Sequence, residues 1–303
     1  MAVQEGTQAP SVGAAPSRGI PALDPVPPVA LVLVGVTSIQ FGAALGATLF
    51  DDLGPAGTSL LRLLLAAVVL VAVWRPRPSR HPARHLRLLV VFGVVLGLMN
   101  LTFYEALDRI PLGIAVTIEF AGPLAVAVAT SRRRLDLAWA ALAALGIVLL
   151  TDPGGGSVDA VGLAFIIVAA CCWAVYILIA QRASRFFSGG TGLSMAMVVA
   201  ALVPLVPGIA EGGANLLDPS LLAIGAAVAL LSSVIPYSLE TEALRRLPAN
   251  VFGVLMSLEP AVAAAAGFVV LGQHLGARDL AAIALVVVAS IGVTRTQPLA
   301  AEA

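Results

Sequence analysis

Long apolar runs recur along the whole chain, and they constrain its fold more than any other feature. Each run has roughly the 17–25 mostly apolar residues that an α-helix needs to cross a bilayer. They number ten, at about residues 29–48, 57–74, 86–104, 113–130, 135–151, 159–180, 191–210, 220–239, 249–271 and 278–294. Hydrophobic residues make up 59% of the chain and charged residues 11%, against about 25% charged in soluble domains. The sequence therefore predicts an all-α membrane protein with ten transmembrane helices.

The arginines predict how these helices are oriented. All 17 positive residues are arginine, and 14 of them fall in the two tails or in alternate loops, such as residues 75–87 and 132–134. Cytoplasmic loops collect positive charge, so both termini are expected in the cytoplasm, with the chain passing many times through the cell (inner/plasma) membrane. Residues 1–28 are rich in Pro, Ala and Gly and lack the apolar core of a signal peptide, so we expect a disordered cytoplasmic tail. Residues 296–303 are expected to form a second, shorter cytoplasmic tail.

A short motif occurs twice and predicts an internal repeat. EALDRIP at residues 105–111 matches EALRRLP at 242–248, an offset of 137 residues. A second proline follows 12 residues on in each copy, at Pro123 and Pro260. Five predicted spans separate the copies, so the two halves, residues 29–152 and 159–295 with a linker at 153–158, are expected to be inverted relative to each other. Inverted repeats are typical of carriers whose binding site lies between the halves.

These segments resemble a known transporter superfamily. The repeat, together with SLEPAVAAAAGFVVLG (residues 257–272) and WAVY (residues 173–176), resembles the EamA-type repeat of the drug/metabolite transporters. Residues 110–133, IPLGIAVTIEFAGPLAVAVATSRR, preceded by NLTFY at 100–104, look like the homoserine/threonine exporter branch. The resemblance implies a ten-helix bundle and proton-coupled efflux of small amino acids. Gln273 departs from it, because the EamA pattern usually has glutamate there, and Gln40-Phe41-Gly42 stands where Trp-Gly is common.

Glu119 is the strongest candidate for a substrate- or proton-binding group. It lies seven residues into an otherwise apolar span, about 10 Å from the span's end at 1.5 Å per residue. A charge at such depth costs on the order of 2.5–3.5 kcal/mol, so it is expected to face a partner or a wet cavity. Pro123 lacks an N–H and pushes against the carbonyl four residues back, which belongs to Glu119. The alternative is a structural kink in which Glu119 hydrogen-bonds to a neighbouring helix.

Glu259 is the second buried carboxylate and lies about 15 Å into its span. It comes immediately before Pro260, the second predicted helix-breaking residue, and it aligns with Gly122 by the repeat register. Glu119 and Glu259 are thus offset by about one helical turn and can flank one cavity from opposite sides. The alternative is that Glu259 braces a kink.

Arg62 and several neutral polar residues complete the predicted substrate-binding set. Arg62 can bind a substrate carboxylate, pair with a carboxylate of the pocket, or extend outward toward Asp51 and Asp52. The neutral candidates are Gln40, Asn100, Tyr104, Tyr176 and Tyr237. Glu240 and Trp173 are further candidates for lining the cavity. Each of these side chains can instead join two helices by a hydrogen bond.

Other classes of function lack their sequence signals. There is no G-x-x-x-x-G-K-[ST] loop for ATP and no His/Cys cluster with metal-ligand spacing, so no cofactor or metal is expected. Formal net charge is zero, which gives no reason to expect nucleic acid, and the scattered polar residues do not predict an enzyme. The sequence therefore predicts a secondary active, proton-coupled exporter of small amino acids (threonine/homoserine-like) or related polar metabolites, with the lipid bilayer, the substrate and protons as partners. The alternative is a carrier of the same fold for drugs or other metabolites, including uptake.

Overall fold

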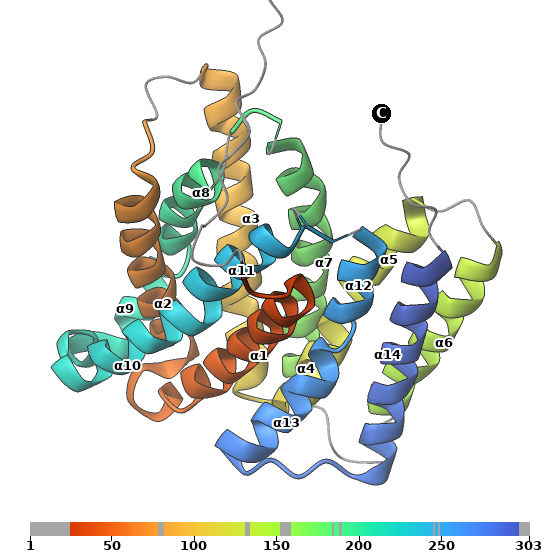
Figure 1. Ribbon diagram of the computed structural model, residues 1–303. Helices are drawn as coiled ribbons and strands as arrows, with labels where there is room; N and C mark the ends of the chain where they lie inside the picture. The colour runs from red at the N-terminus through yellow and green to blue at the C-terminus, as the bar shows by residue number, and fades with distance from the viewer. Residues whose placement is uncertain are drawn as a thin grey trace, which may run out of the picture.

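The computed structural model describes residues 25–77, 82–130, 134–151, 159–183, 185–187, 190–244, 246–247 and 249–296. All regular secondary structure in this part of the chain is helical, and it contains no β-strand (Figure 1). The helices are α1 (Pro28–Ala47), α2 (Phe50–Trp74), α3 (Ala83–Leu107), α4 (Leu112–Glu119), α5 (Ala121–Thr130), α6 (Arg134–Thr151), α7 (Ala160–Ala183), α8 (Thr191–Leu202), α9 (Leu205–Gly212), α10 (Pro219–Ala229), α11 (Ile235–Leu244), α12 (Ala249–Met256), α13 (Glu259–Leu271) and α14 (Ala277–Thr296), with short helical turns η3 (Gly213–Leu217) and η4 (Leu230–Val234). The predicted tail at 1–28, apart from its last four residues, and the linker at 153–158 lie outside the described residues.

The all-helical prediction is confirmed, and each of the ten apolar runs contains helix. Eight helices or helix pairs in the described part of the chain are long and apolar enough to cross a membrane. A ninth span results if α8 and the segment Leu205–Leu217, bent by 55°, are taken together. The remaining run contains the shorter apolar helix Leu135–Leu150.

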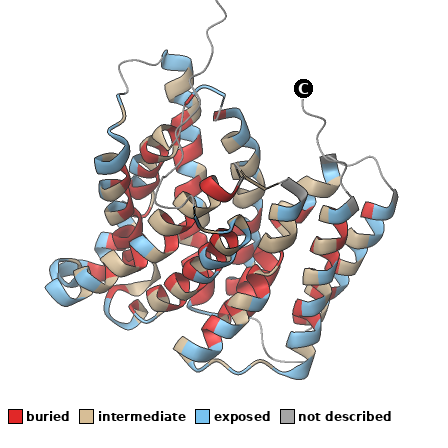
Figure 2. Ribbon diagram, in the orientation of Figure 1, coloured by how far each residue is buried: buried red, intermediate tan, exposed pale blue. Residues whose placement is uncertain are grey.

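Large apolar side chains are exposed on the outer faces of the helices, as a bilayer requires. Val68 is 59% exposed, Val148 61% and Val269 67%. Buried residues gather on the faces that the helices turn toward one another (Figure 2). Because lipid is as apolar as these side chains, the hydrophobic effect does not hold the helices together, and close packing has to do so. Gly93 and Gly97 of α3 lie directly against α8, where an added Cβ would approach the carbonyl oxygens of Ala196 and Ala200 to 2.5 and 2.6 Å.

The two copies of the repeated motif have the same local structure. In each, a helix ends, a turn follows, and an eight-residue helix begins; α4 at residues 112–119 and α12 at residues 249–256 are related by the offset of 137 found in the sequence. Arg109 pairs with Glu105 at 3.1 Å in the first copy, and Arg246 donates to Glu242 at 2.8 Å in the second.

Both eight-residue helices are followed by a break and a second helix. The first break, at Phe120, separates α4 from α5, and the second, at 257–258, separates α12 from α13. The two broken spans run in opposite directions, since α4 leads upward to α5 whereas α12 leads downward to α13 (Figure 1). They meet at Gly113 of α4, where an added Cβ would lie 2.8 Å from Cα of Ala264 in α13.

A third break interrupts α2 near its start. Gly54 has φ +67°, a left-handed conformation that favours glycine, and Pro55 follows it. The backbone N–H of Ala56, where the helix resumes, is left without a partner in the helix and donates to Oε2 of Glu211 at 2.8 Å. Glu211 of α9 thus caps the resumed helix from a distant part of the chain.

Candidate functional site

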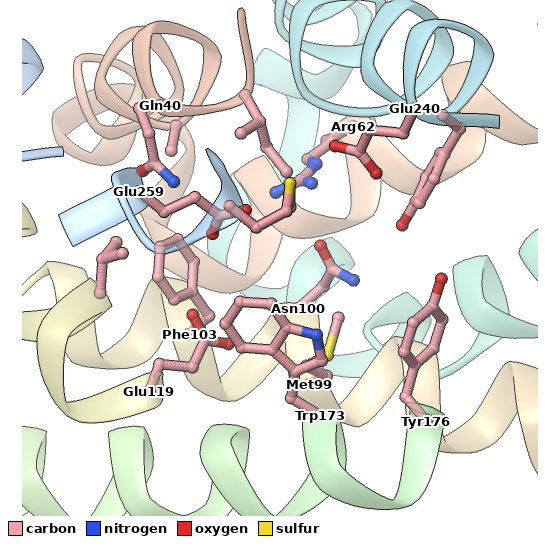
Figure 3. A pocket seen from close by; sticks show the side chains of 15 residues that line it. Gln40, Arg62, Met99, Asn100, Phe103, Glu119, Trp173, Tyr176, Glu240 and Glu259 are labelled. Carbon is pink, nitrogen blue, oxygen red and sulfur yellow. The ribbon is translucent and has the colours of Figure 1, made fainter. Parts of the chain in front are cut away.

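A central pocket of about 150 Å³ brings together most of the candidate residues. Its polar lining residues are Gln40 (α1), Arg62 (α2), Asn100 (α3), Glu119 (α4), Tyr176 (α7), Tyr237 and Glu240 (α11), and Glu259 (α13). Figure 3 shows Gln40, Arg62, Glu240 and Glu259 on one side and Glu119, Trp173 and Tyr176 on the other. The lining therefore comes from both sequence halves.

Arg62 is the only arginine among the described residues that line this pocket. Its side chain is held from two directions: Nη2 donates to the carbonyl oxygen of Ser232 at 3.1 Å, and Nη1 lies 3.4 Å from the hydroxyl of Tyr104. The guanidinium also lies over the ring of Tyr104, 5.5 Å from its centre. Nε is buried with no hydrogen-bond partner. The ion pairs among the described residues do not include Arg62. The position of Arg62 in the pocket differs from the outward orientation toward Asp51 and Asp52.

The carbonyl of Ser232 is available because the backbone changes geometry there. Residues 230–234 form a π-helical turn, and Pro236 follows. Proline has no N–H to bond the carbonyl four residues back, and that carbonyl belongs to Ser232. Turns of this type are frequent at functional sites. The freed oxygen accepts from Arg62 and so fixes the guanidinium at the pocket wall.

The three carboxylates reach the pocket from different helices. Two of them lie at helix ends of opposite polarity, so the electrostatic field at each differs. Glu119 is 8% exposed and is the last residue of α4, at the negative end of the helix dipole. Glu259 is 4% exposed and is the first residue of α13, at the positive end, which favours a negative charge. Glu240 is partly exposed. None of the three forms an ion pair or hydrogen bond with the described residues, so their oxygens are free to bind a ligand or proton.

The predicted helix-breaking prolines lie close to these carboxylates. Pro123 is in the first turn of α5, just after the break at Phe120, and also lines a neighbouring apolar cavity of about 300 Å³. Pro260 is in the first turn of α13, directly after Glu259. Trp173 and Met256 line both cavities and so separate the neighbouring cavity from the central pocket.

The neutral candidates divide into residues that line the pocket and one that does not. Asn100 donates Nδ2 to its own helix, at the carbonyl of Leu96 (2.8 Å), which leaves its Oδ1 to the pocket. Tyr176 and Tyr237 are hydrogen-bonded to each other. Tyr104 is fully buried behind Arg62 and does not line the pocket. Its hydroxyl and its ring instead contact the guanidinium of Arg62.

The carbonyl of Ser232 was not among the partners predicted for Arg62. A signal was present, since the argument that applied to Pro123 and Glu119 applies equally to Pro236 and Ser232. The apolar lining residues Ile39, Met99 and Phe103 carried no such signal, because they resemble any other residue of a membrane helix. Within the part of the chain that the structure describes, no three His, Cys, Asp or Glu side chains are placed so that they could hold one metal ion.

Comparisons with known proteins agree with this architecture. The model of the EamA-like transporter family matches residues 160–295. The threonine/homoserine exporter RhtA of Escherichia coli (strain K12) is 42% identical over 271 residues, covering 89% of this chain and 92% of the relative. RhtA of Salmonella typhimurium (strain SL1344) is 41% identical over the same length.

The fold also matches that of solved structures, among them a crystal structure. It superposes with a TM-score of 0.60 over 87% of this chain and 96% of that chain, at 18% identity. An identity this low speaks for the fold alone. The long match at 42% identity, by contrast, settles the family: this chain is a multi-pass membrane protein of the EamA-like transporter family, near its RhtA branch.

Proposed function

We propose that this protein is a secondary active exporter of threonine, homoserine and similar small amino acids, driven by proton entry. The observation that carries the proposal is a small buried pocket with one arginine and three carboxylates, in a chain 42% identical to threonine/homoserine exporters. A zwitterion needs both charges within a few ångströms. Arg62 supplies the donors for the carboxylate, and Glu119 or Glu259 accepts from the ammonium.

The size of the pocket favours a small amino acid over a drug. Pockets for drug-sized ligands occupy roughly 300–1,000 Å³, whereas this pocket has about 150 Å³. A drug-sized molecule would require the helices to separate, but a four-carbon amino acid would not. The alternative of a drug carrier with the same fold is therefore less favoured.

The proposed architecture is ten transmembrane helices in two inverted halves, residues 29–152 and 159–295. Three observations support it: the identical register of α4 and α12, the matching Glu–Arg pairs that precede them, and the opposite directions of the two broken spans. Broken helices in corresponding positions of two halves are the usual place of a carrier's binding site.

The proposed orientation places both termini on the cytoplasmic side of a bacterial-type inner membrane. It follows from the 14 arginines assigned to one side. On this assignment the break beside Glu119 belongs to a span that enters from the outer face at Pro111.

Glu119 is the proposed proton-binding group. It stands at the negative end of α4 with no pairing partner among the described residues, so neutralisation by a proton or by a substrate ammonium is favoured over a bare charge. Competition between these two cations for one carboxylate couples proton entry to substrate exit.

The test is accumulation of labelled threonine and homoserine in inside-out membrane vesicles with an acidic interior. Vesicles with the wild type are expected to accumulate both amino acids, and this accumulation is expected to stop when an ionophore collapses the pH gradient. Glu119→Gln is expected to remove the gradient-dependent part, whereas the control Asp51→Asn, an exposed carboxylate outside the pocket, leaves it intact. If accumulation by Glu119→Gln equalled that of the wild type, the proton role of Glu119 would be refuted.

A further inference from the structure

A second hollow, separate from the central pocket, opens where the start of α3 meets the end of α7. It measures about 660 Å³ and is lined by Arg84, His85, Arg87, Leu88, Val91, Arg182 and Phe186. None of these lining residues is acidic. Three guanidinium groups therefore converge on one hollow without a carboxylate from the described residues to neutralise them.

One of the three arginines is held by a neighbouring side chain, and all three retain most of their donors. Arg84 donates Nε to Nε2 of His85 at 3.2 Å, and the ring of His85 stacks on Phe186 with 4.1 Å between the ring centres. Arg87 and Arg182 have no ion pair or hydrogen bond with the described residues. A guanidinium binds phosphate oxygens through two parallel donors, so this set is suited to a phosphate group.

The depth of the hollow places it at the level of lipid headgroups. A helix of 25 residues such as α3 is about 37 Å long at 1.5 Å per residue, which exceeds the ~30 Å hydrocarbon core. The excess is about five residues over the two ends of α3, so Arg84, its second residue, lies beyond the core, and Arg87, its fifth, lies at the boundary, from which an arginine side chain can extend to the headgroups. Arg182 is in the last turn of α7.

The wall of the hollow continues into the surface that faces lipid. Leu88 and Val91 lie one and two turns further along α3 than Arg84. Val91 is 51% exposed and Phe186 41% exposed. A free phosphate would make no favourable contact with these apolar side chains, whereas the acyl chains of a phospholipid would cover them.

We propose that this hollow binds the phosphate headgroup of an anionic phospholipid such as phosphatidylglycerol, with the acyl chains along Leu88, Val91 and Phe186. Basic pockets between transmembrane helices are a recurrent way of binding acidic headgroups. The proposed lipid site does not depend on which substrate is transported, because this hollow and the central pocket share no lining residue.

The test uses native mass spectrometry of the full-length protein in detergent, titrated with phosphatidylglycerol and with phosphatidylcholine of the same chain length. The wild type is expected to retain phosphatidylglycerol in preference to phosphatidylcholine. The triple variant Arg84→Gln/Arg87→Gln/Arg182→Gln is expected to weaken its binding on the order of 100-fold, from about fivefold per arginine. The control Arg75→Gln/Arg77→Gln/Arg295→Gln removes three arginines of the same expected membrane side that do not line the hollow.

Two further arms separate the alternatives. Phe186→Gln keeps the charges but removes the apolar wall, so it is expected to weaken phosphatidylglycerol binding while leaving binding of glycerol 3-phosphate unchanged. If glycerol 3-phosphate displaced the lipid at equal concentration, the site would be one for soluble phosphates and the proposal would be wrong. Equal losses in the triple variant and in its control would likewise overturn it, because general surface charge would then explain the binding.

Discussion

Arg62 shows how one residue gives the pocket its polarity. Burying a charge without a partner is costly, and Arg62 is 6% exposed. Its hydrogen bond to the carbonyl of Ser232 and its contact with Tyr104 offset part of this cost. No carboxylate of the described residues forms an ion pair with the guanidinium, and the proposed binding of a substrate carboxylate depends on this.

The first prediction concerns Arg62→Gln and Arg62→Lys. A hydrogen bond to a charged group contributes about 1.5–3 kcal/mol, so Arg62→Gln is expected to raise KM for threonine roughly 10- to 100-fold. Arg62→Lys keeps the charge but loses the planar fork, and an intermediate KM is expected. Transport kinetics in vesicles measure both, with Arg295→Gln as a control outside the pocket. An unchanged KM in Arg62→Gln would show that another group holds the carboxylate.

At the scale of elements, breaks in helices create the site. α4 ends beside Glu119, α13 begins at Glu259, and the π-helical turn η4 frees the carbonyl that holds Arg62. Each break turns backbone groups that a regular helix would use internally toward the pocket. An apolar membrane segment thereby acquires a polar face with few charged side chains.

The second prediction tests the turn at η4. Pro236→Ala restores an N–H that can bond the carbonyl of Ser232, so this oxygen is withdrawn from Arg62. The variant is expected to be at least as stable to heat as the wild type in detergent, yet to have a raised KM for threonine. Pro219→Ala, at the start of α10 where proline costs nothing, is the control. A KM equal to that of the wild type would mean that η4 does not position Arg62.

The third prediction concerns the capped break in α2. Glu211→Ala leaves the N–H of Ala56 without its acceptor and is expected to cost on the order of 1 kcal/mol of stability. Glu211→Gln retains an acceptor oxygen and is expected to lose less. Gly54→Ala forces a Cβ against Oε2 of Glu211 at φ +67°, so it is expected to be the most damaging of the three. Thermal unfolding in detergent ranks them, and a more stable Gly54→Ala would contradict the strained geometry.

The sequence predicted the elements better than the site. Each of the ten apolar runs contains helix, because long apolar segments in a membrane have to satisfy their backbone hydrogen bonds internally, and eight or nine of them are long and apolar enough to be spans. The break in α2 was missed, since Gly54 and Pro55 lie before the predicted span at 57–74. Tyr104 was predicted to bind substrate, but whether a buried tyrosine faces a pocket or a neighbouring arginine depends on packing between helices, which residue spacing along one helix does not encode.

At the scale of the whole molecule, the central pocket lies between the two sequence halves. Gln40, Arg62, Asn100 and Glu119 come from the first half, and Trp173, Tyr176, Tyr237, Glu240 and Glu259 from the second. If the halves are inverted copies, a small rotation of one against the other opens the pocket to one membrane face and closes it to the other. The proposed export then requires no conformational change other than this rotation.

The sidedness of the two matching turns decides whether the two halves are inverted. Single cysteines are placed at Asp108 after α3 and at Leu247 after α11, in a chain whose own Cys171 and Cys172 are replaced by serine. Labelling in intact cells with a thiol reagent that does not cross membranes is expected to modify Asp108→Cys and to spare Leu247→Cys until the membrane is permeabilised. Modification of both, or of neither, in intact cells would place the turns on one side and contradict the inverted carrier.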